Sequence, residues 1–237
     1  MLASWTCNLL RARCRRRQEY RHMGHLPLHR YELFHSSDPA YVCDMVGRIL
    51  GPERLEVMGS TPLDVRMHSR RLFDVSISFL AYGPEVVVEA NSTNGYFAIH
   101  LPLTGCSEVR HRRGLFTSTP ALALVVSPSD AVAIRWFPGC AKLLIRIERV
   151  ALETRRASML GECLRHPLRF ESEMDVERGG GASLARSIRY FAKQLGHARE
   201  IVNNDLFVHE FERMLMVELL MNQPHSYSDQ LRLLRDR

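Results

Sequence analysis

The first regular spacing of hydrophobic positions along the chain is that of a helix. Val42, Val46 and Ile49 recur at intervals of three or four residues, so they fall on one face of a helix. The side chain of Asp38 can cap the start of this helix, and Gly51 can end it. We therefore expect a short amphipathic helix between these two residues.

Between residues 55 and 147 the spacing changes, and hydrophobic and polar residues alternate in short runs that end at Gly, Pro, Asn or Ser. Alternation is typical of strands that bury one face. In the stretch FDVSISFLAYG, for example, Val75, Ile77 and Phe79 alternate with serines. The region predicts about eight or nine strands at roughly ten-residue spacing. Such density favours an antiparallel β-barrel or double-sheet jelly roll over a parallel sheet.

After Pro167 the alternation stops and helical spacing returns. The stretch ERGGGAS is expected to be a flexible break. Leu184, Ile188 and Phe191 then fall on one stripe, and a second apolar segment begins at Ile201. Two successive helices predict a helical hairpin after the barrel, in a protein that is mainly β.

The second of these helices is unusually apolar, and its stripe is too wide for contact with the barrel alone. A second buried face on this helix suggests an interface between subunits. The expected dimerisation residues are Phe207, Phe211, Met214, Leu215 and Leu219.

Charge is concentrated at the start of the chain. The formal net charge is +6. Six arginines and one glutamate in residues 1–22 contribute +5 of it, which leaves +1 for residues 23–237. The nearly neutral body therefore does not argue for binding to duplex DNA. The basic start lacks the apolar core of a secretory signal, and no long apolar run predicts a membrane span.

A search for catalytic chemistry finds no constellation that would support it. Metal-dependent barrels of this size use a His-x-His pair on one strand, whereas AIHLPLTG offers a lone His100. The six cysteines form no C-x-x-C pair, and we expect reduced thiols in a cytoplasmic protein. Motifs of serine nucleophiles, phosphate loops and zinc hydrolases are absent. We expect no enzyme activity, metal or cofactor.

A barrel without catalytic residues can still bind a small molecule inside. Aromatic and imidazole side chains on the alternating strands are the candidates for such a pocket, although alternation alone leaves open which strand face is inside. The candidate effector-binding residues are His68, Tyr82, Tyr96, His100 and Trp136.

Several segments, in this order and spacing, resemble one known family. They are LAYGPEVVVEA, YFAIHLPLTGCSEVRHRRG, ALALVVSPSDAVAIRWFPGCAKLLIRIERVALE, GECLRHPLRFE and the linker-like LLMNQPHSYSDQL. The chain is similar over residues 33–231 to the N-terminal cupin-like domain of transcription regulators of the AraC/XylS type.

The resemblance implies a barrel that binds a small-molecule effector and helices that form a homodimer. It also implies a C-terminal DNA-binding domain with two helix-turn-helix units. We expect that domain to be absent from this sequence, because only QLRLLRDR follows the linker, and any contact with DNA would depend on it. Pro224 ends the preceding helix, so NQPHSYSD is expected to be an exposed connection toward that domain.

On this interpretation the chain has four parts. They are a basic, disordered extension (1–30), a cupin-like sensor barrel with its leading helix (31–176), a helical dimerisation unit (182–222) and the start of an interdomain linker (223–237). Two other classes stay open: a metal-dependent cupin enzyme, and a dimerisation module that binds no ligand.

Overall fold

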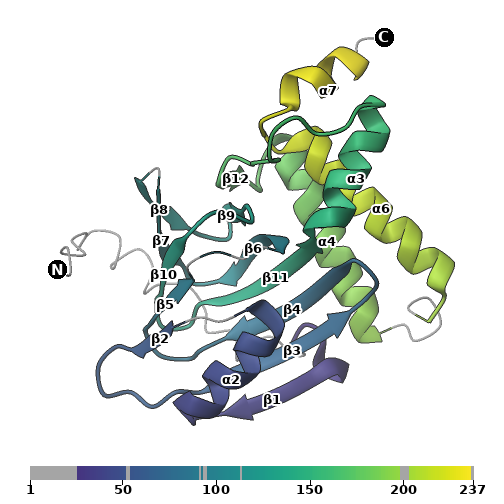
Figure 1. Ribbon diagram of the computed structural model, residues 1–237. Coiled ribbons are helices and arrows are strands. Elements are labelled where there is room, and N and C mark those ends of the chain that lie inside the picture. The colour runs from purple at the N-terminus through teal and green to yellow at the C-terminus, as the bar shows by residue number, and fades with distance from the viewer. Residues whose placement is uncertain are drawn as a thin grey trace.

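A computed structural model describes residues 26–51, 54–90, 92, 95–112, 114–197 and 203–235. It contains two antiparallel sheets, and helices cover one side of the larger sheet (Figure 1). Most of the expected N-terminal extension lies outside the described residues. Its last part is not a free extension, because Leu28 is fully buried against the larger sheet.

The two sheets form the expected jelly-roll-like barrel, with all strand pairs antiparallel. The larger sheet runs β1 (Glu32–Ser36), β3 (Val65–Arg71), β4 (Val75–Ala81), β11 (Ala141–Glu148), β6 (Tyr96–Thr104), β9 (Leu122–Val126) and β12 (Glu173–Asp175). The smaller sheet runs β2 (Arg54–Val57), β5 (Val86–Ala90), β10 (Val132–Trp136), β7 (Ser107–His111) and β8 (Gly114–Ser118). The prediction of a mainly β fold followed by helices is confirmed.

Strand β11 lies in the middle of the larger sheet and separates two hydrophobic layers. Leu143 and Ile145 join the layer between the sheet and the helices. Leu144 joins the layer between the two sheets, which is the barrel interior. By alternation, Lys142 and Arg146 share the interior face with Leu144. The two basic residues therefore lie at different positions along the barrel interior, four residues apart on β11.

Helix α2 (Pro39–Leu50) is the amphipathic helix that the sequence predicts. The Asp38 carboxylate accepts a hydrogen bond from the amide of Ala40 at 2.9 Å, and Gly51 takes a positive φ of 84° at the other end. Val42 and Val46 are buried among interior residues of the barrel. The helix thus covers one open side of the barrel.

Helix α3 (Arg149–Leu160) follows β11 directly and was missed from the sequence. It buries only Leu152 and Arg156, so its hydrophobic stripe is weak. Its end is marked by Gly161, which has a left-handed φ of 69°. Periodicity alone gives little signal for a helix with so small a buried face.

Helices α4 (Gly179–His197) and α6 (Asp205–Asn222) pack against each other beside α3 (Figure 1). The rings of Phe191 and Phe211 stack with centroids 3.4 Å apart at their contact. The expected flexible break is instead the first turn of α4. A Cβ on Gly181 would lie 2.1 Å from the carbonyl oxygen of Asp175, so close packing requires glycine there. Among the described helices none is long and apolar enough to span a bilayer.

The segment expected to be an exposed connection is packed onto the barrel instead. The Gln223 amide donates to the carbonyls of Glu171 and Glu173 at 2.7 and 3.0 Å. The Tyr227 hydroxyl donates to the His166 carbonyl at 2.5 Å, and helix α7 (Ser228–Arg235) follows. The polar residues suggested a solvent-exposed segment, but their side chains bond backbone carbonyls of residues 166–173.

Candidate functional site

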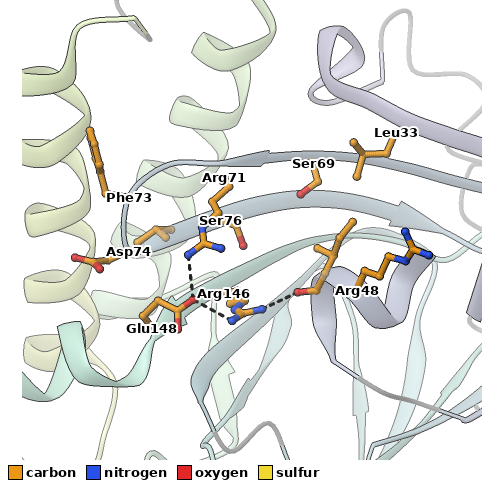
Figure 2. Close-up of a pocket in the computed structure, with 11 residues that line it drawn as sticks. Leu33, Arg48, Ser69, Arg71, Phe73, Asp74, Ser76, Arg146 and Glu148 are labelled. Atoms are coloured by element: carbon orange, nitrogen blue, oxygen red, sulfur yellow. Dashed lines mark hydrogen bonds and ion pairs between the residues drawn. The ribbon is translucent and has the colours of Figure 1, made fainter. Parts of the chain in front are cut away.

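A hollow of about 250 Å³ opens at one end of the barrel interior, between α2 and the turn that joins β3 to β4. We call it the mouth pocket (Figure 2). Its lining comes from β1, α2, β3, the β3–β4 turn, β4 and β11. The lining residues are Leu33, Arg48, Ile49, Ser69, Arg71, Phe73, Asp74, Val75, Ser76, Arg146 and Glu148.

Arg146 lies at the centre of the pocket lining, with its side chain 26% exposed. Its Nη1 donates to the Ile49 carbonyl at 2.8 Å, and its Nη2 donates to the Glu148 carboxylate at 2.9 Å. The guanidinium lies 4.3 Å from the ring centroid of Tyr96, and its Nε is buried without a hydrogen-bond partner. The group is therefore held in place while part of its bonding capacity stays unused.

Glu148 is shared by two guanidiniums, as the dashed lines in Figure 2 show. Arg71 approaches its carboxylate at 4.0 Å and is 75% exposed, whereas the Arg146 contact is shorter. Arg48 pairs instead with Asp44, one turn earlier in α2, at 2.8 Å. The Arg71, Arg146 and Glu148 group consequently carries an excess positive charge.

One wall of the pocket, the β3–β4 turn, is attached to helix α6 by Glu212. The backbone amides of Phe73, Asp74 and Val75 donate to its Oε1 at 3.0, 3.1 and 2.9 Å. The Phe73 ring also stacks on His209 of α6, with centroids 3.8 Å apart. Glu212 is 2% exposed, and burial raises its pKa although the three hydrogen bonds act to lower it. The wall and the helix are therefore bonded to each other at this contact.

A second polar group lies on the same face of β11, and all of its members are buried except His100, which is partly exposed. We call Tyr82, His100, Ser107, Trp136, Cys140 and Lys142 the lysine cluster. Lys142 is fully buried, donates to the Ser107 hydroxyl at 2.7 Å and lies 4.1 Å from the Trp136 ring centroid. Tyr82 meets the same indole edge to face at 5.1 Å.

The titration of the lysine cluster is strongly perturbed. Burial lowers the pKa of Lys142 to about 8, and Cys140 opposes this shift. Burial, followed by repulsion from Lys142, lowers the pKa of His100 to about 3. Among the described residues no carboxylate pairs with Lys142, and neither His100 Nδ1 nor Trp136 Nε1 has a hydrogen-bond partner. The ammonium is thus stabilised by a hydroxyl and an aromatic face alone.

The structure divides the five effector-binding candidates among three places. Tyr82, His100 and Trp136 belong to the lysine cluster, and Tyr96 supports Arg146 from below the mouth pocket. His68 lies on the opposite face of its sheet, where it contacts Phe79 and the Pro27 carbonyl at 2.6 Å. None of the five lines the mouth pocket. The structure does not bring them together into one site.

The residues that line the mouth pocket were missed because the search favoured aromatic and metal-binding side chains. A signal was available in the alternation itself. Ser76 on β4, and Arg146 and Glu148 on β11, are polar residues at positions that alternate with core residues. Polar side chains that point into a barrel indicate either a buried network or a binding site.

The expected dimerisation residues also separate. Phe211, Leu215 and Leu219 are buried in the protein's own core, which α6 shares with α4. Phe207 and Met214 are 37% and 44% exposed. Only these two of the five could contact another subunit without rearrangement of α6.

A search of the described residues for three or more His, Cys, Asp or Glu side chains able to hold a metal finds none. Cys140 and Cys163 are free thiols, as expected. Cys106 is disulfide-bonded, so the expectation of a fully reduced set is wrong at that residue.

Comparison with known proteins places this architecture in a family. Residues 42–221 match the model of the AraC-binding-like domain. A probable thc operon regulatory protein of Rhodococcus erythropolis is 22% identical over 184 residues, which are 76% of this chain. The chain spans only 55% of that relative.

A solved structure supports the same fold. The crystal structure of the AraC-like transcriptional activator CuxR aligns with a TM-score of 0.57 at 16% identity. The alignment covers 86% of this chain and 76% of that one. Since the family model matches most of the barrel and both packed helices, this chain belongs to the AraC-binding-like domain family.

Proposed function

We propose that residues 26–235 form the effector-binding and dimerisation part of a cytoplasmic transcription regulator. A small molecule binds in the mouth pocket, and contact with DNA belongs to a separate helix-turn-helix domain. Family membership and the likeness to two regulators support this assignment.

The contact between the mouth pocket and α6 is the observation that carries this proposal. Three consecutive amides of a pocket wall donate to Glu212, and Phe73 stacks on His209 of the same helix. A ligand that packs against this wall binds one position of α6 more tightly than others. The ligand then shifts the population of α6 positions by that difference in affinity.

The test combines a ligand screen with hydrogen–deuterium exchange. The probes are sugars, amino acids, carboxylates and phosphate esters, and the first measurement is the melting temperature. A ligand raises it by mass action. We expect such a ligand also to change exchange in α6, residues 205–222. If no probe raises the melting temperature, or if binding leaves α6 exchange unchanged, the proposal fails.

A matched pair of variants tests the role of Glu212. Glu212→Gln keeps an oxygen acceptor for the three amides but removes the charge. Glu210→Gln makes the same change at an exposed position of α6, where Glu210 pairs with Arg213. We expect ligand binding to persist in both variants, while the ligand-dependent change in α6 exchange decreases only in Glu212→Gln. Equal behaviour of the two variants would show that this contact transmits nothing.

The same helix supports the proposal of a homodimer. Leu206, Phe207, Met214 and Met221 of α6 are large hydrophobic residues with exposed side chains. Burial of such residues between two copies would remove apolar surface from water. We expect sedimentation to show a dimer that Met214→Lys weakens and that the neighbouring Arg213→Gln leaves intact. A monomeric wild-type protein would contradict this part of the proposal.

A further inference from the structure

We propose that the ligand of the mouth pocket is a small organic anion whose carboxylate or phosphate group binds Arg146 and Arg71. This inference rests on the proposed function and names the chemical class of the effector. The anionic group replaces Glu148 as the partner of the two guanidiniums, and the remainder of the ligand lies against the apolar part of the pocket lining.

The charge arrangement of the pocket favours an anion. Arg71 and Arg146 share the single carboxylate of Glu148. Asp74 is the other carboxylate of the lining, but among the described residues it forms no ion pair with either guanidinium. The two guanidiniums and Glu148 therefore carry one excess positive charge, which a bound anion compensates. A cationic ligand would instead have to compete with both guanidiniums for Glu148.

Arg146 is the part of the pocket that is prepared for binding. Its guanidinium is fixed by the Ile49 carbonyl and by the Tyr96 ring, so little side-chain entropy is lost when a ligand binds. Its Nε has no partner although it is buried. A guanidinium with free donors recognises carboxylate and phosphate through paired hydrogen bonds. Arg71 is largely exposed and can close onto the anion from outside.

The remaining lining defines the rest of the ligand. Leu33, Ile49 and Val75 supply apolar contact, and Phe73 brings an aromatic ring from the turn. The Ser69 hydroxyl already bonds that of Ser78 at 2.7 Å, which leaves Ser76 as the more available hydroxyl. The volume of about 250 Å³ is below that of pockets for drug-sized ligands, roughly 300–1,000 Å³. The ligand is therefore a small acid with an apolar body.

Matched pairs of probes separate charge from shape. Hexanoate and hexanamide share one skeleton, as do phenylacetate and phenylacetamide, and phenyl phosphate tests the alternative anionic group. We expect calorimetry to show that at least one acid binds roughly tenfold or more tightly than its amide, because the amide cannot form charge-assisted bonds. Whichever of the carboxylates and phenyl phosphate binds more tightly identifies the preferred anionic group.

Three variants then locate the binding site. Arg146→Gln should weaken binding of the acid roughly tenfold, and Arg71→Gln should weaken it somewhat less. Glu148→Gln should strengthen binding of the acid because a competing carboxylate is removed. Arg149→Gln is the control, since Arg149 pairs with Glu153 beyond the end of β11. Far-ultraviolet circular dichroism checks that each variant is folded, and the exposed Arg71 keeps the test valid if Arg146→Gln fails to fold.

The possible outcomes distinguish this inference from the proposed function. If the amides bind as tightly as the acids and change α6 exchange, the inference fails and the proposed function stands. If acids bind equally well to the arginine variants but not to Lys142→Met, the anion site is the lysine cluster and the inference also fails. If none of the probes binds at millimolar concentration and the broader screen finds only neutral ligands, the anionic class is wrong.

Discussion

Two basic residues four positions apart on the interior face of β11 have opposite environments. Lys142 is fully buried and donates a hydrogen bond to the Ser107 hydroxyl, whereas Arg146 borders a hollow open to solvent. An ammonium can lose its proton at moderate pH, and the pKa of Lys142 is accordingly lowered to about 8. A guanidinium keeps its charge and must be matched by partners, which Ile49 and Glu148 provide in part.

The lysine cluster and the mouth pocket also differ in whether they contact helix α6. The lysine cluster holds three of the aromatic and imidazole candidates, but it contacts the interior of the barrel only. The mouth pocket holds none of the five candidates, but its wall is bonded to α6. Contact with α6, rather than aromatic content, distinguishes the mouth pocket from the lysine cluster.

The largest effect is expected from the pocket wall. Glu212→Ala leaves the amides of Phe73, Asp74 and Val75 without their acceptor, which should lower the free energy of unfolding by about 3 kcal/mol or more. Urea denaturation measures the loss. Glu212→Gln, which keeps an acceptor, should cost clearly less. Equal losses in the two variants would mean that the amide contacts contribute little.

The next largest effect is a gain in the free energy of unfolding as pH rises, and we expect it from the lysine cluster. Protonated Lys142 is penalised in the folded state, and the penalty disappears as pH rises from about 8 toward 10.5, the pKa of an ordinary lysine. The unfolded chain binds the extra proton in this range, so stability should rise with pH, by up to about 3 kcal/mol.

Lys142→Met removes this dependence and serves as the reference. At neutral pH the variant should be as stable as the wild-type protein or more stable, because an unpaired buried charge is replaced by an apolar side chain of similar length. The measurement is denaturation of both proteins across this pH range. Parallel curves for the two proteins would contradict the assignment of the shift to Lys142.

His100 should produce a weaker effect at acidic pH. Its pKa is lowered to about 3 in the folded protein, so the imidazole stays neutral while that of the unfolded chain gains a proton below about 6.5. Stability from this residue is therefore lost as pH falls through that range, by about 1 to 2 kcal/mol near pH 5. His100→Gln should show a flatter acid limb in denaturation experiments, and an unchanged limb would count against a neutral His100.

Substitution of Arg48 should have the smallest effect on stability and on acid binding, although Arg48 lines the same pocket as Arg146. Its pair with Asp44 lies on the surface, and both side chains are more than half exposed. Arg48→Ala should change the free energy of unfolding by less than about 1 kcal/mol. It should also leave acid binding nearly unchanged, as calorimetry can measure. A loss as large as that of Arg146→Gln would require a third guanidinium in the site.

The barrel could be predicted from sequence because its signal is local. The alternation of hydrophobic and polar residues in β4 and β11 indicates strands directly, and Asp38 and Gly51 mark the ends of α2. Helix α3 buries two side chains and gave no comparable signal. The described residues between 54 and 148 hold ten strands, β2 to β11, where eight or nine were expected. Strand β12 lies beyond that region and was not expected, because its three residues bury too few side chains to show a period.

The mouth pocket could not be predicted because its lining is assembled from distant parts of the chain. Leu33, Arg71 and Arg146 come together only when β1, β3 and β11 occupy one sheet in that topology. The contact of Glu212 with residues 73–75 spans more than 130 positions. Glu212 was not singled out from the sequence, because nothing near it in the chain shows that its carboxylate is buried and bonded to donors from residues 73–75.

The end of α2 gives Arg146 one more consequence. The last carbonyls of a helix have no partner within it and carry the negative end of its dipole. In this protein Arg146 bonds the carbonyl of Ile49, and the Tyr96 hydroxyl bonds that of Leu50. Because the guanidinium stays in place when an acid binds, it is Arg146→Gln, and not ligand binding, that would leave the C-terminal turn of α2 short of one donor and of a compensating charge. Fraying of that turn in this variant would show that Arg146 also stabilises a helix on the face of the larger sheet that is opposite to α6.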